Sequence, residues 1–153
     1  MEPKHTIKAE KCDFSILCVG GPGSGKTSLI KNHAFLNQDD YGDPHEVKVY
    51  TAYLTFNFGG KEQEKTFKFI DTPSTFTTED LTKPNMKNIK AIFVCADLSS
   101  AASSEIAQYW LYASHFRYLE CFLLLIGTKE DLVPKSKKQE VHDQLKKVAE
   151  IFQ

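Results

Sequence analysis

The most regular feature of the chain is a series of short, almost continuous apolar runs. Residues 13–20 have the length and composition of a β-strand that is buried on both faces, and residues 91–96 and 121–126 those of further buried strands. Between these runs and after the last one, apolar residues recur every three or four positions, which predicts helices with one apolar face. The helical segments are 26–36, 103–117 with Trp110 on its core side, and a last helix marked by Val141, Leu145, Val148 and Phe152, with a capping-box pattern at Ser136 and Gln139.

A different pattern lies between the first helix and the second apolar run. Residues 47–58 alternate with period two, and residues 65–71 form a partner strand after a turn that begins at Gly59-Gly60. The polar segment 37–45 and the threonine-rich segment 72–88 are expected to be loops. Strands that alternate with helices predict an α/β fold, in which helices cover both faces of an open, mostly parallel sheet. The hairpin adds one antiparallel edge strand.

The composition is that of one soluble globular domain. The chain has 153 residues and a net charge of −1, so no bulk electrostatic attraction to nucleic acid or to an anionic membrane is expected. The four cysteines show no C-x-x-C spacing, which favours reduced core thiols in a cytosolic protein over zinc ligands or disulfides. Residues 1–11 are charged and lack an apolar stretch, so we expect a flexible N-terminal arm and no signal peptide. We also expect no direct lipid anchor, because the chain ends without a C-terminal cysteine.

The clearest chemical motif follows directly after the first predicted strand. Residues 20–27 read Gly-Gly-Pro-Gly-Ser-Gly-Lys-Thr and fit the phosphate-loop pattern G-x-x-x-x-G-K-[ST] in full. Such a loop turns its N–H groups inward around an anion, and the helix that starts within it adds a partial positive charge. Lys26 would reach phosphate oxygens, and the Thr27 hydroxyl would ligate Mg²⁺. The candidate phosphate-binding residues are Gly20, Gly21, Pro22, Gly23, Ser24, Gly25, Lys26, Thr27 and Ser28.

Two later motifs indicate a metal ligand and a base-recognition loop. Asp71 closes a strand in the sequence Phe-Ile-Asp-Thr-Pro, where its carboxylate would hold Mg²⁺ directly or through water. Thr128, Lys129 and Asp131 follow the apolar run 121–126 in the pattern Thr-Lys-x-Asp. A fixed carboxylate at Asp131 would accept two hydrogen bonds from guanine, whereas adenine would leave that carboxylate unpaired. The stem of Lys129 would lie along the base, so the motif favours a guanine nucleotide.

In order and spacing these motifs resemble the Ras superfamily of small GTPases, most nearly its Rab and Ras branches. The resemblance covers about residues 12–152 and implies a P-loop NTPase fold, a three-layer αβα sandwich with strand order 2-3-1-4-5. It implies that Mg²⁺ with GTP or GDP is the ligand, and that effectors or regulators bind two switch segments, here residues 38–51 and 72–86. The expected protein is a cytoplasmic molecular switch in signal transduction or vesicle trafficking, and membrane recruitment would go through a partner.

The switch segments depart from the family pattern. A gapless count from the phosphate loop places His45 where the family has a switch threonine, and Thr51 is predicted to lie within a strand. Ser74 replaces the glycine whose N–H contacts the γ-phosphate, and Thr75 replaces the glutamine that orients the attacking water. Pro22 stands at a loop position where side chains hamper hydrolysis in the family. We therefore expect slow or absent GTP hydrolysis, and no catalytic residue is identified.

A third departure concerns length, because the family has another strand, another base loop and a last helix beyond this point. Residues 12–153 would then form a C-terminally incomplete G domain with weaker guanine affinity than a complete one. An alternative is a pseudo-GTPase scaffold that binds nucleotide constitutively or not at all. A small P-loop kinase fits less well, because Arg117 is the single arginine and such enzymes need an arginine-rich lid.

Overall fold

The computed structural model describes residues 14–33, 46–83, 86 and 88–152. The five strands are β1 (Phe14–Gly20), β2 (Lys48–Phe58), β3 (Lys61–Asp71), β4 (Ile89–Asp97) and β5 (Phe122–Thr128). The α-helices are α1 (Lys26–His33), α2 (Ser103–Arg117) and α3 (Lys138–Glu150), with short 3-10 helices η1 (Thr78–Thr82), η2 (Glu130–Leu132) and η3 (Lys135–Lys137). The sheet order is β2-β3-β1-β4-β5, and β2 alone runs antiparallel to its neighbour. The predicted α/β class, strand order and antiparallel edge strand are confirmed.

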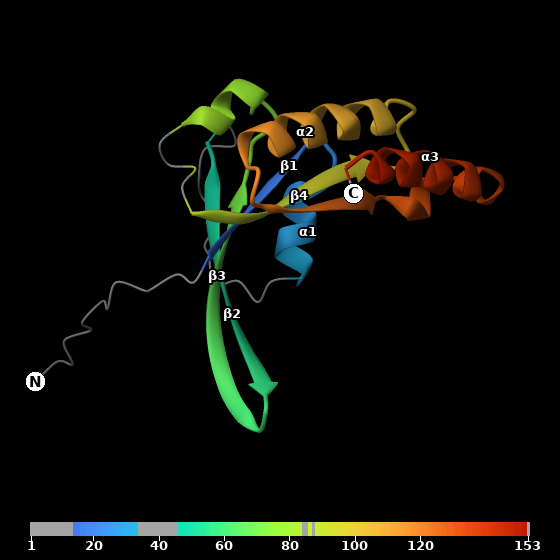
Figure 1. The fold of residues 1–153 in the computed structure, drawn as a ribbon. Helices are drawn as coiled ribbons and strands as arrows, with labels where there is room; N and C mark the ends of the chain where they lie inside the picture. The colour runs from blue at the N-terminus through green and yellow to red at the C-terminus, as the bar shows by residue number, and fades with distance from the viewer. Residues whose placement is uncertain (1–13, 34–45, 84–85, 87, 153) are drawn as a thin grey trace, which may run out of the picture.

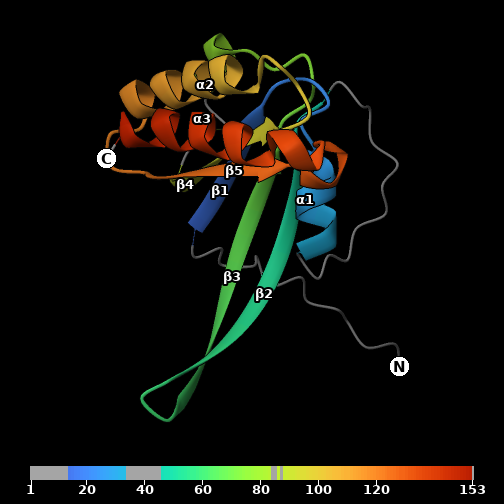
Figure 2. The same ribbon diagram turned by 90° about the vertical axis from the view of Figure 1, so that its right-hand side faces the viewer.

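Helices cover the sheet on both faces, as Figures 1 and 2 show. α2 and α3 lie on one face, where Trp110 and Val148 join the fully buried Leu17 and Val19 of β1 in the larger core. α1 lies on the opposite face, where Ile30 packs in a smaller cluster with Tyr50 of β2. The central strand β1 is therefore buried on both sides, as its apolar sequence predicts, and its carboxyl end is held firmly in the middle of the molecule.

The β2–β3 hairpin extends well beyond the rest of the sheet (Figures 1 and 2). Its strands pair along their whole length, from Lys48 opposite Asp71 to Phe58 opposite Lys61. The predicted turn is confirmed, because Gly59 and Gly60 both have positive φ, at 60° and 76°, as a two-residue type I′ turn requires. β3 begins four residues earlier than predicted, since the polar stretch after the turn has no apolar alternation to reveal a strand.

One strand is less buried than its sequence suggests. The run 121–126 is predicted to be a buried strand, but β5 lies at the sheet edge, where Phe122 is 65% exposed and Leu124 39% exposed. Leu123 and Leu125 face the core under α2 and α3, whereas no helix among the described residues covers the other face there. An apolar run shows that a residue can be buried, and the neighbouring elements decide whether it is.

Two local predictions also need correction. Residues 72–88 are not all loop, because η1 forms within them and buries Leu81. The capping box at Ser136 and Gln139 does not form, since Ser136 lies inside η3 and the residue before α3 is Lys137, which makes no side-chain cap. Both differences arise where short 3-10 turns precede or replace a predicted element, and such turns leave little periodicity in a sequence.

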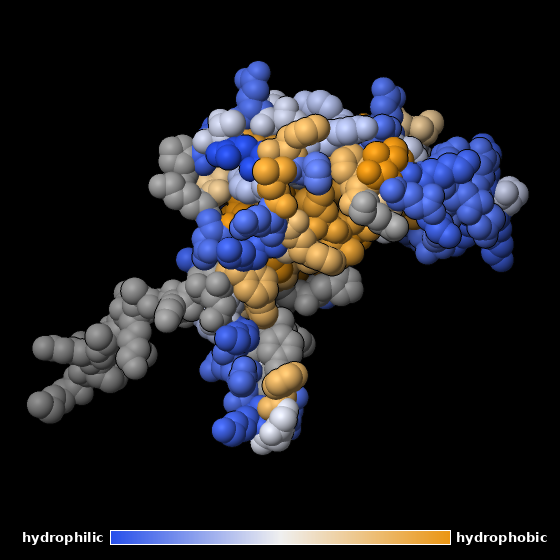
Figure 3. Space-filling model, viewed as in Figure 1, coloured by the Kyte–Doolittle hydropathy of each residue, from blue (hydrophilic) through white to orange (hydrophobic). Residues whose placement is uncertain are grey.

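The surface of α3 is largely hydrophilic (Figure 3), and two of the cysteines are buried as predicted. Figure 3 shows hydrophilic side chains over the end of α3 that begins at Lys138, and an apolar area nearer the middle of the same face. Cys18 and Cys95 are buried free thiols, and burial raises the pKa of both, to about 11 for Cys95.

Within the described part of the chain, no helix combines the length and apolar character that a bilayer crossing demands. The predicted arm 1–11 and loop 37–45 lie outside the described residues, as do residues 34–36 of the first predicted helix.

Candidate functional site

The phosphate-loop residues form a turn between the end of β1 and the start of α1. A side chain at Gly20 would collide with the carbonyl oxygen of Cys95 in the neighbouring strand and with Ser24 Oγ. Gly25 adopts a φ of 86°, which few other residues adopt, and its Cα faces Thr128. The glycines are thus needed for close backbone approach on one side and for the left-handed turn on the other.

Lys26 lies inside this loop. Its side chain is 6% exposed, and Nζ donates to the carbonyl oxygens of Gly20 at 3.3 Å and Gly21 at 3.1 Å. Burial lowers the pKa of the ammonium group, an effect opposed by the nearby carboxylate of Asp71. The loop therefore holds a buried cation on its own backbone, at the place where an anion would enter.

Thr27 and Asp71 meet across the gap between α1 and β3. The Thr27 hydroxyl donates to Asp71 Oδ2 at 2.5 Å, and the carboxylate is 4% exposed. Burial raises the pKa of Asp71, although the Thr27 hydrogen bond and the charges of Lys26 and Lys48 oppose this rise. Asp71 Oδ1 and Ser24 Oγ are buried and have no hydrogen-bond partner among the described residues. A hydroxyl beside a carboxylate with an unused oxygen is a donor set that fits Mg²⁺.

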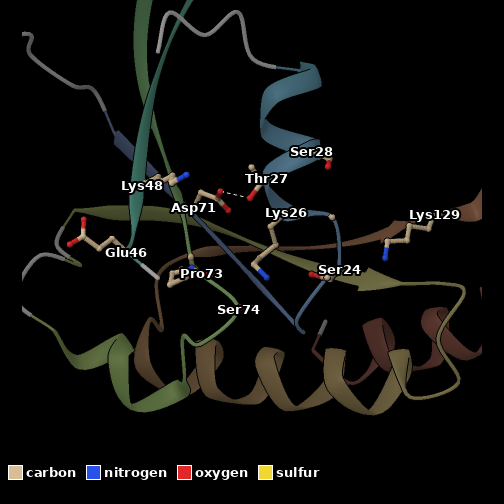
Figure 4. A pocket seen from close by; sticks show the side chains of 13 residues that line it. Ser24, Lys26, Thr27, Ser28, Glu46, Lys48, Asp71, Pro73, Ser74 and Lys129 are labelled. Atoms are coloured by element: carbon tan, nitrogen blue, oxygen red, sulfur yellow. Dashed lines mark hydrogen bonds between the residues drawn. The ribbon is translucent and has the colours of Figure 1, made fainter. Parts of the chain in front are cut away.

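These groups share one cleft of about 360 Å³, seen from close by in Figure 4. Its lining residues are Gly23, Ser24, Gly25, Lys26, Thr27, Ser28, Glu46, Lys48, Asp71, Thr72, Pro73, Ser74 and Lys129. Gly21 and Pro22 instead line a small hollow on the α2 side of the loop, with Ile106. The structure therefore brings most of the predicted phosphate and metal residues together, and it adds residues that motif reasoning missed.

Glu46 and Lys48 are the main additions to the cleft. They belong to the segment that enters β2, which carries no motif of its own. A signal was nevertheless present, because counting pairs outward from the turn at Gly59-Gly60 places Lys48 opposite Asp71, as observed. Register within a hairpin is set by its turn, so the position of one charged residue could have been derived.

The three predicted base-recognition residues differ in their contacts and in whether they line the cleft. Thr128 Oγ1 lies 2.6 Å from the carbonyl oxygen of Ser24 and 3.2 Å from that of Ala96, so its hydroxyl ties β5 to the phosphate loop. Lys129 has a left-handed backbone with φ of 58° and lines the cleft, and its Nζ lies 2.7 Å from Asp97 Oδ2. Asp131 lies in η2, is exposed, and does not line the cleft.

Asp97, at the end of β4, is the partner that fixes Lys129. Burial alone would raise the pKa of its carboxyl, but hydrogen bonds from Lys129 and Ser99 outweigh that effect and hold the pKa below its ordinary value. The ionised carboxylate therefore anchors the lysine ammonium and leaves the aliphatic stem beside the cleft. Sequence reasoning did not select Asp97, which follows an apolar strand just as Asp71 does.

Comparison with known protein families agrees with this geometry. Residues 15–152 match the family model described as Ras family. The chain belongs to the Ras family. Membership accounts for the order of the phosphate loop, the strand-end carboxylate and the base-side loop, and it identifies a GTP-binding protein of the small GTPase type.

The predicted second switch segment of this Ras-family chain contacts α2. The Phe76 ring stacks on Trp110 with centroids 6.1 Å apart, and the hydroxyls of Thr78 and Tyr109 lie 2.9 Å apart. Tyr118 Oη donates to the carbonyl oxygens of Leu81 at 3.0 Å and Met86 at 3.3 Å. These contacts tie Phe76, Thr78, Leu81 and Met86 to α2 and to Tyr118, the residue that follows it.

The residues predicted to stand at altered family positions lie in different surroundings. Ser74 lines the cleft, whereas Thr75 is exposed and does not line it. Thr72 is buried and donates to the carbonyl oxygen of Cys18 at 2.7 Å, which fixes the chain just after Asp71. His45, the candidate for the first switch, lies outside the described residues, and Thr51 lies within β2 as predicted.

Proposed function

We propose that this protein binds GTP and GDP together with Mg²⁺ and acts as a molecular switch with slow GTP hydrolysis. The observation that supports it most is the meeting of Lys26, Thr27 and Asp71 at one end of the cleft. A hydroxyl bonded to a carboxylate, with a buried cation in the same cleft, suits a metal-bound polyphosphate, and the loop 20–28 would hold the phosphates through its N–H groups.

Each end of the cleft has a proposed role. Thr27 and Asp71 would hold Mg²⁺, which when bound neutralises charge on the phosphates. Lys26 would move its ammonium from the loop carbonyls to the phosphate oxygens. At the other end Lys129 would lie along the base, and Asp131 would accept the hydrogen bonds that select guanine. Thr128 would act by joining the base-side loop to the phosphate loop.

We propose slow hydrolysis because the side chain at the water-orienting position, Thr75, is not suited to hold the attacking water. Thr75 is short and exposed, and Ser74 has a more restricted backbone than the glycine of the family pattern. A single-turnover assay with GTP should give a rate far below that of Ras-family members that carry glutamine, and Thr75→Gln should increase it. An unmodified chain that hydrolyses GTP at the ordinary family rate would contradict this proposal.

The proposed partner surfaces are residues 38–51 and 72–86, through which effectors or regulators would read the bound nucleotide. A place in the Rab or Ras branch, a role in signalling or trafficking, and cytoplasmic location with recruitment through a partner belong to the same proposal. The pseudo-GTPase scaffold is the second candidate, favoured by the packing of Phe76 on Trp110 of α2 and the hydrogen bond from Tyr118 to Leu81. It would use these surfaces without a nucleotide signal.

One titration separates the two candidates. Fluorescent GDP, GTP and ATP analogues are added to the purified protein with Mg²⁺, and folding is verified by circular dichroism. Binding of both guanine nucleotides with little binding of ATP would support the switch. A folded protein that binds none of the three would contradict the switch and leave the scaffold in its place.

A further inference from the structure

We propose that Lys48 is a second phosphate-binding cation, which makes nucleotide binding less dependent on Mg²⁺. This inference rests on the proposed function and concerns the same cleft. Lys48 stands outside the phosphate loop, the strand-end carboxylate and the base-side loop. Its position is set by the β2–β3 hairpin.

The hairpin register brings Lys48 to the metal end of the cleft. Lys48 pairs directly with Asp71 in the antiparallel ladder, and directly opposed residues place their Cβ atoms about 4.5–5.5 Å apart on one face of the sheet. That face is the one toward α1, because Tyr50, two residues further along β2, packs with Ile30. Figure 4 shows the Lys48 side chain on the cleft wall beside Asp71 and Thr27.

The lysines of the cleft are placed to bind a polyphosphate. Lys129 is paired with Asp97, whereas Lys26 and Lys48 line the metal end together with the carboxylates Glu46 and Asp71. Lys26 and Lys48 both act on the charge of the buried Asp71 carboxylate. Fixed positive charge beside a metal ligand repels a divalent ion and attracts phosphate, and both effects are strengthened where the carboxylate is shielded from water.

This charge balance changes how much the metal contributes to affinity. With Lys48 present, the phosphates keep a cationic partner at the metal end even when Mg²⁺ is removed. Without Lys48, Mg²⁺ would bind with less repulsion and would also be the main source of positive charge there. The ratio of nucleotide dissociation constants in EDTA and in Mg²⁺ therefore reports the role of Lys48 directly.

The test measures that ratio for a fluorescent GDP analogue with the full chain, Lys48→Met, Lys48→Arg and Lys61→Met. Lys61 is a matched control, because it is an exposed lysine on the same hairpin, at the far end from the cleft. We expect the ratio to rise about tenfold in Lys48→Met and to stay near that of the unmodified chain in Lys48→Arg and Lys61→Met. A ratio unchanged in Lys48→Met, or raised equally in Lys61→Met, would overturn the inference.

A second measurement tests the effect of Lys48 on metal binding in the absence of nucleotide. Mn²⁺ binding to the nucleotide-free protein, followed by electron paramagnetic resonance, should be tighter for Lys48→Met than for the unmodified chain. Unchanged or weaker Mn²⁺ binding by this variant would count against the inference. If the unmodified chain binds no guanine nucleotide in Mg²⁺ or in EDTA, the proposed function fails as well. If it binds tightly and only the ratio is insensitive to Lys48, the role of Lys48 alone fails.

Discussion

At the proposed phosphate end of the cleft, Lys26 and Asp71 are almost completely buried and contact neighbouring loops and strands. At the proposed base end, Lys129 is held by one ion pair to Asp97, and Asp131 is exposed on a three-residue turn outside the cleft lining. The phosphate end is therefore part of the protein core, whereas the base end is a surface loop attached to it by Thr128. Substitutions at the phosphate end should alter both nucleotide binding and folding stability. Substitutions at the base end should alter mainly the preference for one base over another.

The largest effect is expected for Lys26→Ala. The substitution removes the buried ammonium, which would be the main cationic partner of the phosphates. We expect affinity for GDP and GTP to fall at least ~100-fold, because a charge-assisted contact in a site shielded from water is lost. Titration with a fluorescent GDP analogue measures this, with circular dichroism to verify folding. Retained affinity in a folded Lys26→Ala protein would mean that the phosphate end does not bind phosphate.

Asp131→Ala should produce a smaller and different change. The preference for guanine over adenine should fall by about 10- to 100-fold, because the variant no longer rejects a base that lacks the matching donors. The unfolding midpoint should hardly move, since Asp131 is exposed. Competition between GDP and ADP analogues measures the preference, and a large loss of stability would show that the two ends are not separable.

Asp71→Asn should increase the stability of the ligand-free protein, by about 1 kcal/mol, because an ionised buried carboxylate with an unsatisfied oxygen is costly. Burial raises the pKa of Asp71, so folding favours the protonated form. Its contribution is present at acid pH and is lost as pH rises through the raised pKa. Denaturant unfolding in EDTA should therefore show the advantage of Asp71→Asn growing from acid to neutral pH. If the stability advantage of Asp71→Asn shrank from acid to neutral pH, the raised pKa of Asp71 would be contradicted.

The smallest effect is expected for Thr128→Val, which tests the link between the two ends. The substitution keeps the shape but removes the hydroxyl that reaches Ser24 and Ala96, at a cost of about 1 kcal/mol. Chemical unfolding measures the stability, and affinities for both GDP and ADP analogues should decrease by a similar factor. A decrease in affinity for the GDP analogue alone would instead indicate that Thr128 contacts the base.

The sequence was most informative where backbone geometry demands particular residues. The glycines around Lys26 and the pair Gly59-Gly60 predicted a phosphate loop and a hairpin turn, and the structure contains both turns where they were expected. Strand order came from the family resemblance, since periodicity alone predicts only a mostly parallel sheet. Residue identity carries this information because few residues other than glycine adopt positive φ.

The sequence was less informative where tertiary packing makes the decision. Phe122 and Leu124 look like core residues, yet they are exposed because β5 is an edge strand with one covered face. The Thr128 hydroxyl donates to the backbone carbonyls of Ser24 and Ala96, a link that the Thr-Lys-x-Asp pattern does not reveal. The placement of Lys48 depends on a pairing that begins ten residues away from it, so no local pattern marks it.

The stacking of Phe76 on Trp110 has a practical consequence, because Trp110 is the single tryptophan of the chain. Its ultraviolet emission comes from one place, directly beneath the segment that follows the strand-end carboxylate. Departure of Phe76 from the indole would admit water and shift that emission to longer wavelength. The protein thus carries its own optical probe, and stopped-flow mixing with unlabelled nucleotide could time the rearrangement of residues 72–86 without a dye.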